Sequence, residues 1–186
     1  YDSMLGKQNS WNQRTVKLGR QQYVTVVSPA ESPRVSLIFL NLPDGNLSGE
    51  GFLASNGQSL QKLEDGSIKR IVSLDGQSRY ESLQLTNALV ALMQTYRPTE
   101  IHTQATSNYS DTFPDHSDHM AAGRFAQRAY DQYNGILPYG QTAPSILRYI
   151  GYPIRDFEAN IGLDELAAKE TAFFAYARFD GRVCHN

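Results

Sequence analysis

Two of the four histidines stand in the short polar segment Pro114–His119, which reads Pro-Asp-His-Ser-Asp-His. His116 and His119 are three residues apart, so a helix that begins at residue 115 or 116 places both imidazoles on one face of its first turn. The positive end of the helix dipole favours neutral imidazole, which is the form that binds a metal ion. A nearby carboxylate such as Asp118 can hold an imidazole in one tautomer, as carboxylates do around metal sites. The spacing therefore indicates metal-assisted or acid–base chemistry.

The same pattern also fits a helix start that does no chemistry. Asp115 is then an N-cap, Asp118 is a favourable acid in the first turn, and the two histidines are surface residues. A catalytic zinc needs about three protein ligands and an open position, and two histidines do not reach that number. A further alternative completes a local metal site with His102, Asp111 or Asp115. The spacing alone leaves these three interpretations open.

The elements around the segment follow an α/β order, which predicts a mainly parallel sheet flanked by helices. Ligands of such sheets gather at loops that follow the carboxyl ends of strands, here loops 41–47 and 106–116. Asp44, in Leu-Pro-Asp-Gly, is typical of a turn, but its place after a buried strand also makes it a candidate substrate contact. The expected elements are a hairpin from 16–18 and 23–27, a buried strand at 35–40, a β excursion at 48–76, a helix of about 18 residues between a capping box at 78–81 and Pro98, a strand at 100–105, a helix at 116–133, a strand at 145–150 and a helix at 164–176 with its aromatic residues in the core.

Composition excludes several classes of protein. The 186 residues carry a net charge of −2, which argues against a nucleic-acid-binding surface, and the chain contains no apolar run long enough for a transmembrane helix. Cys184 is the only cysteine, so an internal disulfide and an all-cysteine zinc site are excluded, and we expect a free thiol or a partner outside this chain.

The chain starts at Tyr1 rather than Met, which predicts a removed upstream segment. Two N-glycosylation tripeptides, at Asn46 and Asn108, favour an extracellular or secreted location.

Residues Asp115–Gly123, Asp-His-Ser-Asp-His-Met-Ala-Ala-Gly, resemble the second signature of the PIG-L/LmbE-like de-N-acetylases. That family carries a His-x-Asp-His segment at a helix start. Residues 40–45 are similar to its strand and Leu-Pro-Asp-Gly loop, and the helix before Pro98 with the strand from Glu100 is similar to the elements before its second signature. Segments 149–153 and 169–176 look like those of a secreted microbial branch. The resemblance covers most of the chain.

The resemblance implies a Rossmann-like zinc hydrolase that removes acetyl groups from N-acetylglucosamine-type sugars or their conjugates. By matching positions, His119 would bind Zn²⁺. His116 would stabilise the oxyanion and protonate the departing amine, and Asp118 would orient and tune His116. Asp44 would line the substrate pocket. The expected partner is thus an acetamido sugar, with no nucleic acid involved.

The sequence also departs from the family pattern. The first signature, His-Pro-Asp-Asp, which supplies two zinc ligands and the aspartate base, does not occur in residues 1–186. Ser117 replaces the usual Pro, and Pro114 stands where some members place a Tyr from a mobile loop. We therefore expect a single domain over 1–186 that lacks the family's N-terminal strand–helix unit and is nearly inactive alone. The alternative is a non-catalytic carbohydrate-binding relative without metal.

Overall fold

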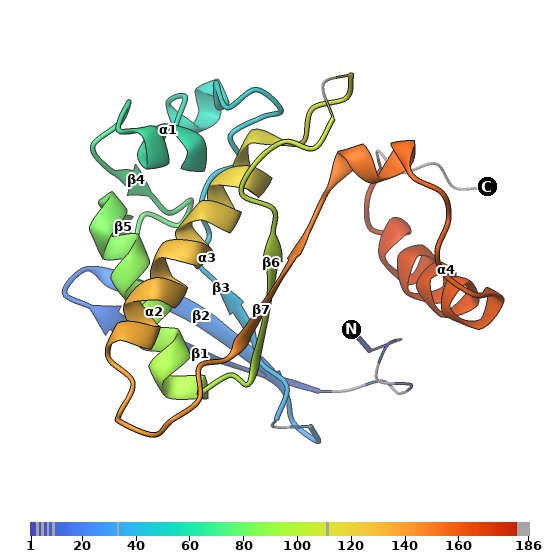
Figure 1. Ribbon diagram of the computed structural model, residues 1–186, viewed down its shortest axis with the longest axis horizontal. Helices are drawn as coiled ribbons and strands as arrows, with labels where there is room; N and C mark the ends of the chain where they lie inside the picture. Colours follow the sequence, from blue (N-terminus) through green and yellow to red (C-terminus); the bar gives the residue numbers. More distant parts are fainter. Residues whose placement is uncertain are drawn as a thin grey trace. The chain divides into compact units, whose positions relative to one another are not determined.

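The structure is a computed structural model that describes residues 1, 2, 4, 6, 8, 10–32, 34–110 and 112–181. Asp111 and Cys184, both singled out above, lie outside the described residues. Figure 1 shows the elements, which in chain order are β1 (Trp11–Gly19), β2 (Gln22–Pro29), β3 (Leu37–Phe39), η1 (Leu53–Ser55), α1 (Leu60–Asp65), β4 (Ile71–Val72), β5 (Arg79–Tyr80), α2 (Ser82–Tyr96), β6 (Glu100–Gln104), α3 (Ser117–Gly135), β7 (Ser145–Tyr149), η2 (Tyr152–Asp156) and α4 (Leu163–Ala177).

The described strands form small sheets within a mixed α/β fold. Strands β1, β2 and β3 are neighbours in that order, β4 pairs antiparallel with β5, and β6 pairs parallel with β7. The expected mainly parallel sheet is therefore seen only as the β6–β7 pair, because an apolar run predicts a buried segment without indicating its pairing partner. Contacts within the chain define two compact units, one of residues 1–13, 27–37 and 157–186 and the other of residues 14–26 and 38–156. No helix in the described part of the chain has the length and apolar character needed to cross a membrane.

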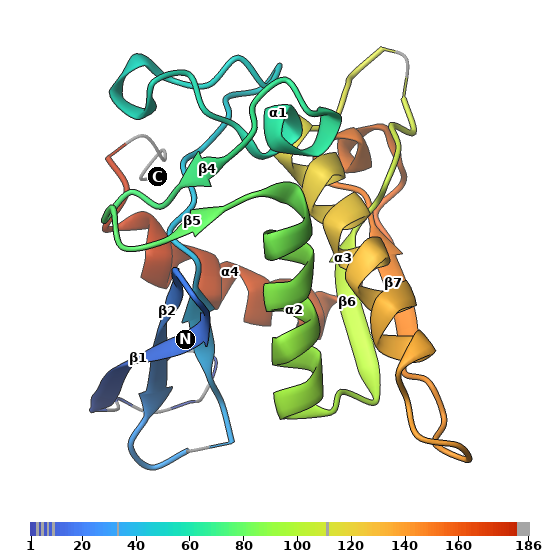
Figure 2. The ribbon, with the colours of Figure 1, turned by 90° about the vertical axis from the view of Figure 1, so that its left-hand side faces the viewer.

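Strand β6, helix α3 and strand β7 form the part of the fold that positions the histidines. The parallel register runs from Glu100 opposite Ser145 to Gln104 opposite Tyr149, and α3 provides the crossover that such a pair requires. Figure 2 shows α3 alongside α2 and in front of the β6–β7 pair. A Cβ atom on Gly123 would lie 2.4 Å from the carbonyl oxygen of Gln104, so only glycine allows α3 this close to the end of β6. Helix α3 consequently starts at the carboxyl ends of both strands.

A hydrophobic core joins α1, β4, β5, α2 and α3 within the second unit. Its fully buried members are Leu63, Ile71, Tyr80, Leu85, Ala88 and Phe125. The core fixes α1 and α2 against α3. It thereby holds in place the residues that α1 and the preceding loop bring to the start of α3.

Several expected elements are confirmed, with small shifts at their ends: the strands at 100–104 and 145–149 and the helices at 117–135 and 163–177. Residues 48–76, expected as a β excursion, contain η1, α1 and only a two-residue strand. The reason is local capping: the Ser59 hydroxyl accepts a hydrogen bond from the Lys62 N–H, and Gly66 ends α1 in the left-handed conformation. Gly66 is thus the C-cap of a helix within the segment that was expected to be β.

Two further expectations are corrected. The capping box of α2 consists of Glu81 and Gln84, while Ser78 instead exchanges hydrogen bonds with the backbone of Tyr23. The aromatic residues of α4 are not core residues, because Phe173 and Phe174 are about half exposed. The apolar periodicity of α4 indicated a helix correctly, but it does not show that another element covers the helix.

Candidate functional site

Loops from two distant parts of the second unit meet at the first turn of α3. The backbone N–H of Ser117 donates to the carbonyl of Leu47 at 3.0 Å, and its hydroxyl donates to the carbonyl of Asn46 at 2.9 Å. The N–H of Gly45 donates to the carboxylate of Asp118 at 2.6 Å. Loop 41–47 therefore lies against the helix start, as expected for loops at the carboxyl ends of strands.

His116 is the N-cap of α3, a role that the sequence interpretation gave to Asp115. Its Nδ1 atom accepts a hydrogen bond from the backbone N–H of Asp118 at 3.1 Å. Because Nδ1 is an acceptor, the neutral ring carries its proton on Nε2. Nε2 lies 3.6 Å from an oxygen of Asp44, and the His116 side chain is 13% exposed whereas that of Asp44 is 68% exposed. His116 thus presents an N–H donor beside an open carboxylate.

The carboxylate of Asp118 accepts hydrogen bonds from the backbone of two neighbouring segments. It accepts from the N–H of Gly45 at 2.6 Å and from the N–H of Leu60 at 3.1 Å. The backbone N–H of Asp118 is the group that donates to Nδ1 of His116. A Cβ atom on Gly45 would lie 2.6 Å from the Asp118 carboxylate, so glycine is needed for this close approach. Asp118 therefore joins the loop of Asp44 and the start of α1 to α3.

His119 is held by Asp115, with which its Nδ1 makes a 2.8 Å contact. The Asp115 side chain is 2% exposed and also accepts from the backbone N–H groups of His116, Gly151 and Tyr152. Burial raises the pKa of Asp115, but the hydrogen bonds from Gly151, His119, His116 and Tyr152 outweigh it and place the pKa below its ordinary value. The carboxylate is thus ionised at neutral pH and accepts a proton-bearing Nδ1. Nε2 of neutral His119 is left with a free lone pair.

The two imidazoles lie side by side, and their Nδ1 atoms meet different groups, a backbone N–H at His116 and a carboxylate at His119. Their ring centroids are 5.2 Å apart, and the ring of Tyr152 stands edge-on to both, at 5.3 Å from His119 and 6.1 Å from His116. His119 offers a lone pair that can bind a metal ion or accept a proton. His116 offers an N–H that can stabilise developing negative charge by hydrogen bonding. The pair is therefore suited to a reaction that needs a lone-pair donor and a hydrogen-bond donor about 5.2 Å apart.

The remaining histidine of this region is elsewhere. The ring of His102 stacks on Tyr149, with Nδ1 2.8 Å from its hydroxyl, and its Nε2 lies 2.5 Å from a Glu100 oxygen. Both ring nitrogens are engaged on β6 and β7. The structure accordingly does not bring His102 into the cluster formed by Asp44, Asp115, His116, Asp118, His119 and Tyr152, which we call the histidine cluster.

The histidine cluster fits one zinc ligand together with its support, but not a complete zinc site. An imidazole that donates Nδ1–H to a carboxylate and keeps Nε2 free is the arrangement that zinc-binding histidines adopt. His119 has this arrangement, whereas His116 does not, because its Nε2 carries the proton. Within the described part of the chain, no group of three or more His, Cys, Asp or Glu residues is arranged to hold a metal ion.

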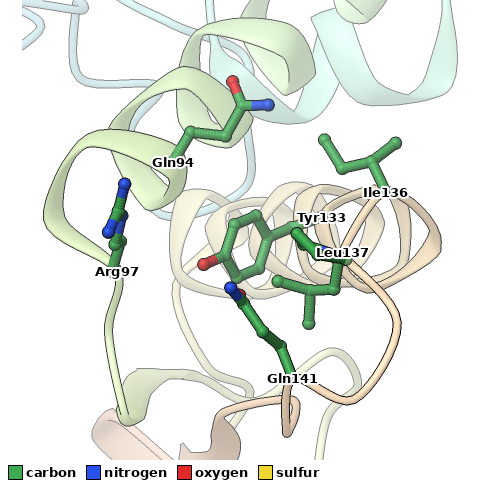
Figure 3. A pocket seen from close by; sticks show the side chains of 7 residues that line it. Gln94, Arg97, Tyr133, Ile136, Leu137 and Gln141 are labelled. Carbon is green, nitrogen blue, oxygen red and sulfur yellow. The ribbon is translucent and has the colours of Figure 1, made fainter.

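A surface cavity of about 270 Å³ lies at the other end of α3 (Figure 3). Tyr133, which lines it, is about four helical turns beyond His119. The other lining residues are Gln94, Arg97, Ile136, Leu137, Pro138 and Gln141. Because it contains no carboxylate, imidazole or thiol, this cavity is a poorer candidate for hydrolytic chemistry than the histidine cluster.

Comparisons of the chain with protein-family models, curated proteins and solved structures give no significant match. The residues of the histidine cluster are therefore the basis on which a function is inferred.

The sequence interpretation missed the contribution of the segment that follows β7. Gly151 and Tyr152 bind Asp115 through their backbone N–H groups, and the ring of Tyr152 borders both histidines. The signal was present, because residues 151–152 also follow the carboxyl end of an expected strand. Applying the same rule to this strand would have added the segment to the site.

Proposed function

We propose that the chain belongs to a zinc-dependent hydrolase that removes N-acetyl groups from N-acetylglucosamine-type sugars or their conjugates, with a Rossmann-like, LmbE-like arrangement. The observation that carries the proposal is the different group that each ring meets at Nδ1, a backbone N–H at His116 and a carboxylate at His119. Hydrolysis of an amide requires an activated water, stabilisation of the oxyanion and a proton for the departing nitrogen. The lone pair on Nε2 of His119 suits the activation of water through zinc, whereas the Nε2–H of His116 suits stabilisation of the oxyanion.

His119 is the zinc ligand in this proposal, through Nε2. When bound, zinc lowers the pKa of its water to about 7 and so supplies the nucleophile. The described residues do not arrange three metal-binding groups together, so His119 is the one ligand that the proposal assigns. His119 contributes a lone pair that Asp115 keeps available.

His116 would donate a hydrogen bond from Nε2–H to the developing oxyanion. The acid role that the resemblance implies would require its imidazolium form, because a neutral ring that gave up Nε2–H would become an imidazolate. The Asp118 backbone N–H keeps the proton of the neutral ring on Nε2 by occupying Nδ1. Asp44 lies 3.6 Å from Nε2 and is open to solvent, so its carboxylate is placed to accept hydrogen bonds from sugar hydroxyls. Asp118 supports this arrangement by holding the neighbouring Gly45.

The test measures zinc affinity by competition with a chelator and acetate release from N-acetylglucosamine. We expect His119→Ala to weaken zinc binding about tenfold or more, because it removes a ligand that is itself supported by a carboxylate. His102→Ala is the matched control, since His102 is an exposed histidine outside the cluster, and it should leave zinc affinity unchanged. Zinc binding that is equal in the wild type and His119→Ala would contradict the metal-ligand role. Binding of the sugar without zinc would instead support the non-catalytic carbohydrate-binding relative.

A further inference from the structure

The carboxylate of Asp115 has a position that capping of a helix does not explain. It precedes α3 by two residues, yet His116 is the N-cap. Instead, its two oxygens receive backbone N–H groups from His116, Gly151 and Tyr152, and the ring of His119. Its side chain is only 2% exposed, so it lacks the solvent contact that a surface acid keeps.

We infer that Asp115 is a positioning residue, whose carboxylate, fixed by the backbone of residues 151–152, holds His119 with Nδ1 protonated and Nε2 free. The inference rests on the proposed function in taking Nε2 of His119 as the working nitrogen. An ionised carboxylate has only acceptor atoms, so the imidazole nitrogen facing it must be the donor. The backbone donors from the β7 loop keep the carboxylate in place, so it cannot turn away from the ring without losing them.

Gly151 provides independent support for this arrangement. A Cβ atom at residue 151 would lie 2.4 Å from an Asp115 oxygen and 2.4 Å from Nδ1 of His119. Both distances are shorter than real Cβ contacts, so a side chain at residue 151 would force the Asp115 carboxylate and the His119 ring to shift. The close approach thus involves three segments: the residue before α3, the first turn of α3 and the loop after β7.

The alternative is a purely structural role, in which Asp115 ties the two loops together and the protonation of His119 is set by something else. The distinguishing measurement is the His119 tautomer, read from long-range ¹H–¹⁵N correlations of the imidazole ring in metal-free protein at a pH where the ring is neutral. A comparison spectrum of His119→Gln assigns the signal. We expect the wild type to be predominantly Nδ1–H.

Asp115→Ala removes the acceptor, so we expect His119 to shift towards the Nε2–H tautomer and its contribution to zinc affinity to fall about 10- to 100-fold. Gly151→Ala keeps both partners but pushes them apart, and we expect the same direction of change. Asp115→Asn retains the shape and one acceptor oxygen and should be intermediate. Asp156→Asn is the matched control, because Asp156 is an exposed acid near the same loop that bonds to Ser110 rather than to His119.

Two separate outcomes can be distinguished. If His119 remains Nδ1–H in a folded Asp115→Ala or Gly151→Ala protein, or if Asp156→Asn shifts it equally, the positioning role is overturned. Should Asp115→Ala fail to fold, Gly151→Ala and Asp115→Asn still decide the tautomer. If the tautomer shifts as expected but the wild type binds no zinc, the zinc function fails while the positioning role stands, because the ring measurement needs no metal.

Discussion

Replacing Asp118 with alanine tests whether this residue acts on the fold or on His116. Its carboxylate accepts backbone hydrogen bonds from Gly45 at 2.6 Å and Leu60 at 3.1 Å. Hydrogen bonds to a charged group contribute about 1.5–3 kcal/mol each. Both bonds are partly buried rather than fully buried, so we take the lower end and expect Asp118→Ala to lower the free energy of unfolding by about 3 kcal/mol. For a chain of this size, that corresponds to a fall in Tm of roughly 6–12 °C.

The assay combines thermal and urea unfolding with the ring spectrum of His116. Asp131→Ala is the matched control on the same helix, because Asp131 is exposed and accepts a hydrogen bond from the exposed side chain of Gln127. We expect a change within about 0.5 kcal/mol. His116 should keep its Nε2–H tautomer in Asp118→Ala, since the backbone N–H that occupies its Nδ1 remains. A loss of stability no larger than that of the control would refute the structural role. A changed His116 tautomer in the folded variant would instead restore the orienting role implied by the family resemblance.

Three other predictions concern the cluster and its support. The folded-state pKa of Asp115 is depressed. Its stabilising contribution is therefore present above the unfolded pKa of about 3.9 and is lost as pH falls through the folded pKa. The difference in unfolding free energy between wild type and Asp115→Asn should shrink below about pH 4, as measured by urea unfolding at a series of pH values. Gly123→Ala should cost about 1–3 kcal/mol by urea unfolding, because its Cβ atom would lie 2.4 Å and 2.5 Å from the carbonyl oxygens of Gln104 and Ala105; an unchanged midpoint would show that α3 can move away from β6. Tyr152→Ala should weaken binding of N-acetylglucosamine in a calorimetric titration, whereas Tyr152→Phe should not, because the ring rather than the hydroxyl borders both histidines; equal affinity in the alanine variant would place the sugar elsewhere.

The parts of the fold that the sequence predicted well are those governed by short-range signals. Helix α3 and strands β6 and β7 lie within a few residues of their expected bounds, because periodicity, prolines and polar loops mark them locally. The failures involve partners that are distant in sequence. Pairing of strands into small sheets and exposure of Phe173 and Phe174 depend on which segments cover which faces. Residues 48–76 were misassigned for a different reason: the helix there is only six residues long, and its cap at Ser59 was overlooked.

The site shows the same division between local and distant signals. Spacing correctly placed His116 and His119 together at a helix start, but it gave them no distinct chemistry. Their difference arises at Nδ1, where one ring meets a backbone N–H and the other meets a carboxylate. The first contact depends on helix capping, whereas the second depends on Asp115 being held by residues 36 and 37 positions further along the chain. His116 and His119 thus differ at Nε2, where one offers a hydrogen-bond donor and the other a lone pair. The difference arises because different segments of the chain contact Nδ1 of each ring.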